Sequence, residues 1–184
     1  VSGFFMVLMP IETVRGEHLR ATVGQAFLSA EESYIPPEIA LASAPFAATE
    51  ATLTTRLGAP VWFIRGTGQE AVIDARSGMQ LSPLDANDIS HVASAAYAGT
   101  GALEGVHYLE EAPQEFGGPV PVWRADFGPQ DRASLYIDPI TAELQSVRTP
   151  LWRTFGFFWG LDVMDWSARE NFSSWWIKET SFFA

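Results

Sequence analysis

The feature that most constrains the fold of this chain is a sequence pattern that occurs twice. Residues 59–81 read APVWFIRGTGQEAVIDARSGMQL, and residues 120–147 read VPVWRADFGPQDRASLYIDPITAELQSV. Trp62 aligns with Trp123 and Asp74 with Asp138 when the extra residues of the second copy are placed in the polar turns GTGQE and GPQDR. Insertions are usual in such turns. The repeat therefore predicts a chain built from two copies of one small structural unit.

Each copy has the residue pattern of three short antiparallel strands. Alternating aromatic and β-branched residues occur in VWFI and AVID of the first copy and in VWRADF and SLYID of the second, before the final strands MQL and ELQSV. Residues that favour turns follow Asp74 and Asp138. Residues 18–29 and 85–98 have the apolar spacing of a helix, and Asp85 is a suitable N-cap for the second helix. We therefore predict an α+β fold in which each unit packs one helix on an antiparallel sheet.

Charge and cysteine content exclude several functional classes. The chain has 22 acidic and 11 basic residues, a formal net charge of -11, which argues against nucleic acid as a partner. It has no cysteine, and this excludes disulfides, thiolate zinc sites and cysteine nucleophiles. The lack of cysteine fits the periplasm as well as the cytoplasm.

Both ends of the sequence have the composition of membrane-proximal segments. The first eleven residues, VSGFFMVLMPI, are apolar but too few to span a bilayer, so we expect the end of a truncated membrane helix, with an ordinary buried element as the alternative. Five of the seven tryptophans follow position 150, and the last residues are suited to a membrane–water interface. We therefore expect an ectodomain held between two membrane helices.

A longer set of motifs begins at the second copy. It comprises PVPVWRADFGPQDRASLYIDPITAEL, then RTPLWRTFGFFWGLDVMDW and ENF, and the chain opens with VSGFFMVLMPIETVRGEHLR. In combination these motifs resemble bacterial inner-membrane proteins with PepSY domains and the PepSY-associated transmembrane helix. Ala142 stands where the family turn has glycine, which suggests a turn that need not adopt positive φ there. Asp162 stands where many members have histidine, which argues against a haem or metal role at that position.

The resemblance implies domain boundaries and a set of motif positions. It divides the chain into the end of a truncated membrane helix (residues 1–11), a first PepSY-like unit (12–84), a second PepSY-like unit (85–149) and an aromatic membrane-proximal helical segment (150–184). The positions that match the family motifs are Trp62, Asp74, Trp123, Arg124, Tyr136, Asp138, Pro139, Thr141, Glu143, Trp152, Arg153, Asp162, Met164 and Asp165.

The residues that could carry chemistry form no catalytic or metal-binding motif. His18, His91 and His107 have no metal-ligand spacing, and a surface or capping role is favoured for His18. Asp162 and Asp165 would share a helix face, either as a cation-binding pair or, as we favour, as polar groups beside the aromatic segment. The acidic patch Glu110, Glu111 and Glu115 could bind calcium weakly, but a solvated face is favoured. The sequence contains neither a GxSxG motif nor a P-loop.

These observations predict a non-catalytic protein without a cofactor or metal. What the resemblance implies is a periplasmic binding or regulatory ectodomain, anchored to the bacterial inner membrane by flanking helices, that either restrains a peptidase or senses a ligand. A protein or peptide partner would bind by adding a strand to a sheet edge. The alternative is the periplasmic cap of a membrane haem or iron-reductase electron-transfer protein.

Overall fold

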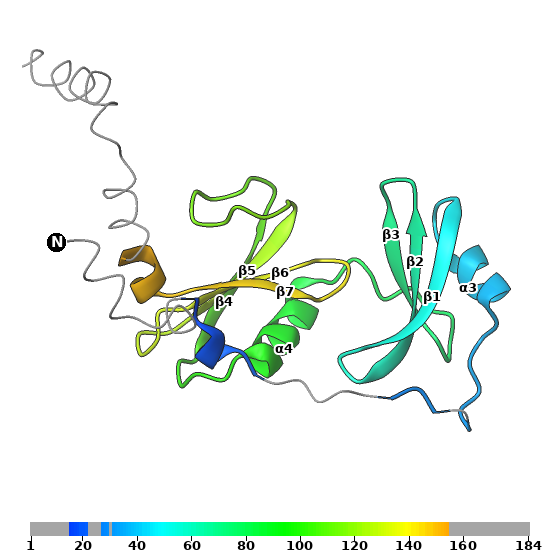
Figure 1. The fold of residues 1–184 in the computed structure, drawn as a ribbon, viewed down its shortest axis with the longest axis horizontal. Coiled ribbons are helices and arrows are strands. Elements are labelled where there is room, and N and C mark those ends of the chain that lie inside the picture. Colours follow the sequence, from blue (N-terminus) through cyan, green and yellow to red (C-terminus); the bar gives the residue numbers. More distant parts are fainter. Residues whose placement is uncertain (1–14, 22–26, 30, 155–184) are drawn as a thin grey trace, which may run out of the picture.

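The computed structural model describes residues 15–21, 27–29 and 31–154, which form two α+β units. Each unit contains one antiparallel sheet and one α-helix, and the two units lie next to each other along the long axis of the molecule (Figure 1). The predicted α+β class is therefore confirmed. Within the described ranges no helix has the length and hydropathy needed to cross a membrane.

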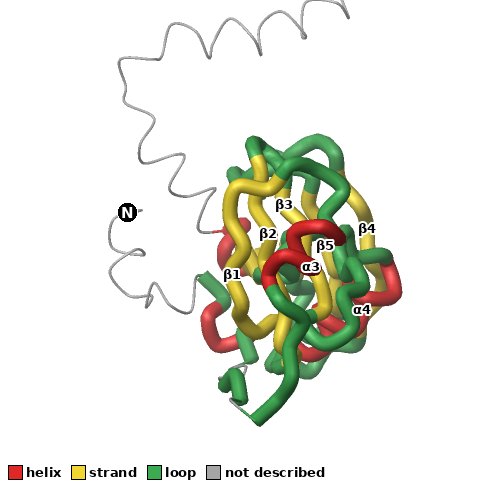
Figure 2. Tube along the Cα trace, turned by 90° about the vertical axis from the view of Figure 1, so that its right-hand side faces the viewer, coloured by secondary structure: helices red, strands yellow, loops and turns green. Residues whose placement is uncertain are grey.

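The first unit consists of a short helix and a three-stranded sheet. Helix α3 (Pro37–Ser43) precedes strands β1 (Ala48–Arg56), β2 (Ala59–Gly66) and β3 (Glu70–Asp74), which pair in the order β1-β2-β3. Pro37 occupies the first helical position, where its fixed φ is already helical and its missing N–H is not needed. The alternation along β2 places Trp62 and Ile64 on the face that α3 covers (Figure 2). The buried residues of this core are Ala40, Trp62, Ile64, Ala71, Ile73 and Ala75.

The second unit has a longer helix and a four-stranded sheet with order β4-β5-β6-β7. Its elements are α4 (Ala86–Ala96), β4 (Leu103–Leu109), β5 (Val122–Phe127), β6 (Ser134–Ile137) and β7 (Leu144–Arg148). The side chain of Asp85 accepts hydrogen bonds from the N–H groups of Asn87 and Asp88, at 2.8 and 2.9 Å. Asp88 completes a capping box by accepting from the Asp85 N–H. The predicted helix and its Asp85 cap are confirmed.

The two faces of the second sheet differ in polarity. One face packs on α4 and is apolar: Ile89 and Val92 of the helix meet Leu135, Ile137 and Val147 of the strands. The opposite face carries polar residues that alternate with these, because successive strand residues point to opposite sides. The polar residues are Arg124, Asp126, Ser134, Tyr136, Ser146 and Arg148. The loop between β4 and β5 lies over this polar face, where Phe116 stacks on the ring of Tyr136.

The helix predicted over residues 18–29 is wrong in its described part. Glu17–Leu19 form only one turn of 3-10 helix, η1, and residues 27–29 have no regular structure; residues 22–26 lie outside the described residues. Arg20 instead forms a β-bridge with Tyr97, and Leu19 is buried in the core of the second unit. Of the apolar residues that suggested this helix, Leu19 packs in the second unit and Phe27 is exposed, while α3 supplies the helix of the first unit.

The two aspartate turns make the same hydrogen bonds. The Oδ1 atoms of Asp74 and Asp138 each accept from the N–H groups two and three residues later, at distances between 2.6 and 3.0 Å. Four residues after each aspartate the backbone is left-handed, with φ 75° at Gly78 and φ 64° at Ala142. The sequence suggested a turn that need not adopt positive φ at Ala142, and the structure shows that it does. The aspartate bonds hold Ala142 in a conformation that costs an L-residue about 1 kcal/mol.

A second hydrogen bond recurs between each turn and the helix of its unit. The N–H of Ile35, just before α3, donates to Ala75 O at 2.8 Å, and the N–H of Leu84, just before α4, donates to Pro139 O at 2.8 Å. Ala75 and Pro139 each directly follow the turn aspartate. In both units this bond ties the start of the helix to the tight turn of the sheet.

Candidate functional site

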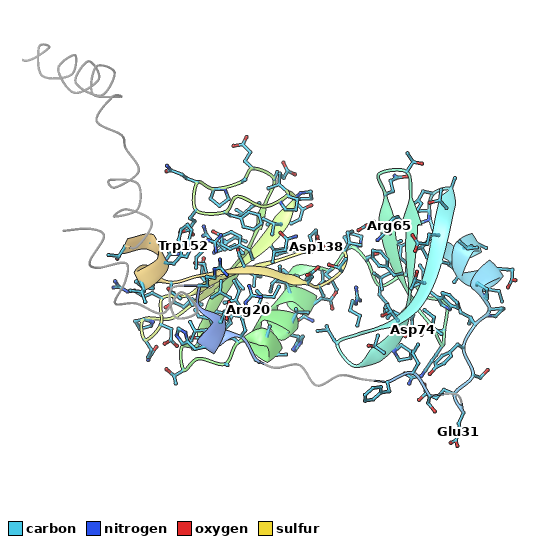
Figure 3. All side chains as sticks on the ribbon, viewed as in Figure 1. Arg20, Glu31, Arg65, Asp74, Asp138 and Trp152 are labelled. Carbon is cyan, nitrogen blue, oxygen red and sulfur yellow. The ribbon has the colours of Figure 1, made fainter. Side chains whose placement is uncertain are left out.

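The Asp138 turn lies where the two units meet, as Figure 3 shows. Arg56, the last residue of β1 in the first unit, donates from Nη1 to Ile140 O at 2.9 Å and from Nη2 to Leu81 O at 3.4 Å. Burial of this guanidinium lowers the pKa of Arg56 from its ordinary value. The Asp74 turn instead contacts the segment before α3, where Arg76 pairs with Glu32 at 2.8 Å. Of the two matching turns, only the second therefore contributes to the boundary between the units.

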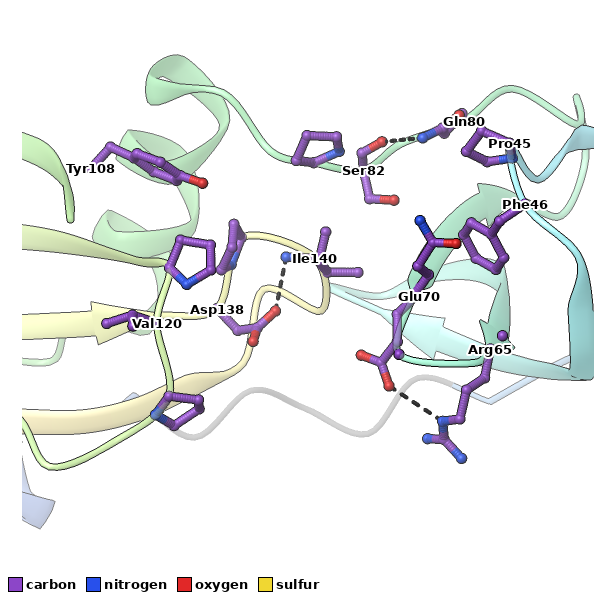
Figure 4. Close-up of a pocket in the computed structure, with 17 residues that line it drawn as sticks. Pro45, Phe46, Arg65, Glu70, Gln80, Ser82, Tyr108, Val120, Asp138 and Ile140 are labelled. Atoms are coloured by element: carbon purple, nitrogen blue, oxygen red, sulfur yellow. Dashed lines mark hydrogen bonds and ion pairs between the residues drawn. The ribbon is translucent and has the colours of Figure 1, made fainter. Parts of the chain in front are cut away.

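A cleft of about 840 Å3 opens at this boundary. Figure 4 shows residues of both units on its two sides. The lining of the cleft is mainly apolar and includes five prolines. The first unit contributes Phe46, Arg65 and Glu70, among others, and the second unit contributes Tyr108, Val120 and Asp138. Tyr108 and Val120 are 47% and 41% exposed. The cleft therefore presents accessible apolar surface framed by residues of both units.

The charged groups of the cleft are already engaged. Arg65 pairs with Glu50 at 3.0 Å and with Glu70 at 3.3 Å, on the solvent-exposed rim. Asp138 uses Oδ1 for its own turn and accepts from Gln145 Nε2 through Oδ2, at 3.2 Å. Because these charges have partners, the cleft is better suited to recognising apolar and backbone groups than a strongly charged ligand.

A network of charged side chains covers the polar face of the second sheet. The Glu115 carboxylate accepts from Arg153 Nε at 2.6 Å and Nη2 at 3.2 Å, and from the Tyr136 hydroxyl at 2.7 Å. Arg153 Nη2 also donates to Ser134 Oγ, which in turn donates to Asp126. The network therefore ties the β4–β5 loop to strands β5 and β6 and to the helical residues 150–154 that follow β7.

This network shifts the pKa values of its members. The hydrogen bonds from Arg153, and then from Tyr136, lower the pKa of Glu115 despite its partial burial. The same hydrogen bond to Glu115 raises the pKa of Arg153, and burial followed by the Glu115 contact raises the pKa of Tyr136. Each shift stabilises the charged Glu115–Arg153 pair and the protonated phenol. These groups are therefore fixed in one protonation state near neutral pH and are poor candidates for acid–base catalysis.

The motif positions do not lie together in one site. Asp138 and Pro139 line the cleft, while Tyr136 and Arg153 meet at Glu115 on the polar face. Trp62 and Asp74 lie in the first unit, where Trp62 Nε1 donates to Ile35 O at 3.1 Å. The remaining described positions, Trp123, Arg124, Thr141, Glu143 and Trp152, lie on or next to the second sheet. Asp162, Met164 and Asp165 lie outside the described residues.

The candidate polar residues do not gather into a metal site. His18 lies in η1, His91 in α4 and His107 in β4, where its Nε2 is 3.6 Å from Asp126 Oδ2. In the part of the chain that the structure describes, no three His, Asp or Glu residues could hold a metal ion together. Glu110 and Glu111 are exposed as expected, but Glu115 is not, because Arg153 and Tyr136 hold it against the sheet. No local sequence signal marks Glu115 as the centre of a network.

Comparison with known proteins identifies no relative of this chain: no protein family, curated protein or solved structure matches it.

Proposed function

We propose that this chain is the non-catalytic, periplasmic binding and regulatory part of a protein anchored in the bacterial inner membrane. It consists, in this proposal, of two PepSY-like units, and the cleft between them binds an extended segment of a protein or peptide partner. The observation that carries the proposal is the cleft itself, because its accessible apolar lining comes from both units. A partner bound there would contact both units at once.

The recurring hydrogen bonds support the assignment of two related units. Both sheets bear the same aspartate turn with a left-handed residue four positions later, and in both a helix is tied to the carbonyl that follows the aspartate. Hydrogen bonds at matching positions are expected when two segments share one folding pattern. The first unit differs from the second in two ways. Its helix is shorter, and a single bridge between Ile73 and Gln80 stands where the second unit has a fourth strand.

The course of the chain supports anchorage from one end of the molecule. A Cβ atom added at Gly16 would lie 3.0 Å from Val147 Cγ1 and 3.3 Å from Thr149 Cγ2, so Gly16, just before η1, lies beside the end of β7. The two terminal segments that we expect to be membrane-proximal lead, along the chain, into Gly16 and out of Thr149. Membrane helices on both sides would therefore approach the second unit and leave the first unit farthest from the bilayer.

The chemistry of the cleft favours an extended, weakly charged peptide. Prolines restrict the backbone around the cleft, so less conformational entropy is lost when a ligand orders it. Aromatic-lined grooves bind extended, proline-rich segments in other recognition modules, and Phe46 and Tyr108 line this cleft. A peptide that binds both units stabilises one arrangement of them, and such differential binding is the physical basis of a regulatory signal. A peptidase segment is one partner with this chemistry.

Selection of random linear peptides on the full chain tests this proposal. Selected peptides should bind Tyr108→Ala and Val120→Ser at least about fivefold more weakly, as expected when about 1 kcal/mol of apolar contact is lost. Met79→Ser is the matched control, because Met79 is 63% exposed and does not line the cleft. Fluorescence anisotropy with labelled peptides gives the affinities. Peptides that bind all three variants equally, or a selection that yields none, would contradict the proposal.

A further inference from the structure

The two units share no apolar core. The core of the first unit lies around α3 and its sheet, the core of the second lies around α4 and its sheet, and no buried residue belongs to both. The helices and strands pack mainly against others of the same unit. Every ion pair of the described chain also joins residues of one unit. Units joined in this way are expected to move relative to each other unless a specific contact holds them.

The linker between the units is tied at both ends. On the side of the first unit, the Val72 N–H donates to Ser82 Oγ at 2.8 Å. On the side of the second unit, the Leu84 N–H donates to Pro139 O at 2.8 Å. A single residue, Pro83, stands between these two ties. The turn that contains Pro139 is therefore the pivot about which one unit can turn against the other.

Arg56 adds a tie that comes from a strand of the first unit rather than from the linker. Its Nη1 donates across the boundary to Ile140 O at 2.9 Å, and its Nη2 donates to Leu81 O at 3.4 Å. Ile140 directly follows Pro139, and its own N–H donates to Asp138 Oδ1 at 2.8 Å (Figure 4). The carbonyl that accepts from Arg56 therefore belongs to a fixed turn, and the bond holds the first sheet against the pivot.

The chemistry of arginine suits this position. Its planar guanidinium can donate to two carbonyl groups at once, whereas lysine presents a single, compact ammonium group. Burial lowers the pKa of Arg56, and the charge of Asp88 acts against that effect. Asp88 lies in α4, so it attracts the guanidinium across the boundary. A carbonyl and a more distant carboxylate of the second unit thus both hold the Arg56 side chain.

We propose that Arg56 is a latch that holds the two units at the separation that the peptide cleft requires; this inference rests on the proposed function of the cleft. Ile140, which accepts from Arg56, is part of the cleft lining. Arg65 and Glu70 of the cleft belong to the sheet that Arg56 holds in place. A turn of that sheet about the pivot would change the width of the cleft. With the latch closed, the cleft is shaped before the partner arrives, which lowers the cost of binding.

The affinity of the cleft should depend on the latch in a defined way. Loss of a hydrogen bond from a charged group shifts an equilibrium by about tenfold or more, so Arg56→Gln should populate arrangements in which the units have turned apart. A peptide that binds only the latched arrangement binds more weakly in proportion to the fraction of molecules that remain latched. Arg56 does not line the cleft, so it acts as a positioning residue.

Distances between two spin labels on the full chain test the latch without any peptide. The sequence has no cysteine, so Glu38→Cys in α3 and Glu104→Cys in β4 place one label on each unit, at exposed positions outside the cleft. Double electron–electron resonance should give a narrow distance distribution for the labelled protein, a broader one for Arg56→Gln, and an intermediate one for Arg56→Lys. Arg76→Gln is the matched control and should change nothing, because Arg76 pairs with Glu32 within the first unit.

The selected peptides provide a second measurement. Their affinity for Arg56→Gln should fall by the same factor as the latched fraction, and saturating peptide should restore the narrow distribution. Far-ultraviolet circular dichroism should show that Arg56→Gln keeps both units folded; if it does not fold, Arg56→Lys decides the question in the same way.

The latch is overturned if the Arg56 variants give a distribution no broader than that of Arg76→Gln. A broadened distribution with unchanged peptide affinity would leave the latch in place and overturn the proposed function of the cleft. A selection that yields no peptide likewise counts against the cleft alone, because the distance measurement needs no ligand. The failure of one proposal is therefore distinguishable from the failure of the other.

Discussion

Replacing Glu115 by glutamine should destabilise the second unit in a way that depends on pH. Glutamine keeps one acceptor oxygen, but its NH2 group faces Arg153 and it has no charge. Three hydrogen bonds of 2.6 to 3.2 Å to the carboxylate are affected. Because hydrogen bonds to charged groups contribute about 1.5–3 kcal/mol and the Glu115 side chain is 24% exposed, we expect a loss of about 2 kcal/mol near neutral pH.

The pH dependence follows from the direction of the pKa shift. Arg153 lowers the pKa of Glu115 in the folded state below its ordinary value of 4.5, so the folded protein holds this proton less tightly than the unfolded chain. The stabilisation is therefore complete above the unfolded pKa and disappears as the pH falls through the folded pKa. The difference in unfolding free energy between wild type and Glu115→Gln should be constant above the unfolded pKa and should shrink as the pH falls through the folded pKa.

Urea denaturation at several pH values, followed by tryptophan fluorescence, measures this difference. Glu111→Gln is the matched control in the same loop, because Glu111 is exposed and its loss should change stability by less than about 0.5 kcal/mol. An equal loss at acid and neutral pH would refute the assigned charge pair. A loss as small as that of the control would refute the inferred role of the network.

Four further substitutions test the fold, each measured as the change in unfolding free energy by urea denaturation. Leu19→Ala should cost about 3 kcal/mol because it leaves a cavity beside α4, whereas Phe27→Ala, at an 85% exposed side chain, should cost nearly nothing; equal effects would show that residues 17–19 do not belong to the second core. Asp85→Ala should cost about 1 kcal/mol by removing the cap of α4, with a parallel loss of helical circular dichroism, and an unchanged value would contradict the capping box. Gly78→Ala should cost about 1 kcal/mol because φ is 75° there. Ala142→Gly should change stability by less than about 0.5 kcal/mol, since relief of the left-handed strain is offset by the loss of a buried methyl group, and a large gain would contradict that burial.

Local sequence patterns predicted most of the regular structure. The alternation of residues identified β2, β3, β5, β6 and β7, because one face of each strand is buried and period-two burial is visible in sequence. The alternation of residues did not predict β1. The residues of this strand, ATEATLTTR, include few apolar side chains, and most of them are partly exposed at the edge of the sheet. Residues 79–81 read as a strand but contribute only the bridge from Gln80.

The candidate sites were much less predictable. The cleft is formed by residues as far apart as Phe46 and Ile140, and the sequence contains no motif that unites them. Glu115 was classed with the exposed Glu110 and Glu111, because its partner Arg153 is 38 residues away and the pairing depends on how the loop folds over the sheet.

The sequence by itself determined those features whose hydrogen bonds join residues within a few positions of each other. The Asp85 cap and the turns at Asp74 and Asp138 belong to this class, since a side chain and a nearby backbone N–H meet in almost any fold that contains them. The tertiary structure decided where segments distant in sequence come together. Leu19 precedes the first unit in the sequence but is buried in the core of the second unit. Burial depends on which apolar surface is available in the folded chain. The sequence pattern shows which residues form an apolar face, but it does not show which other segment that face packs against.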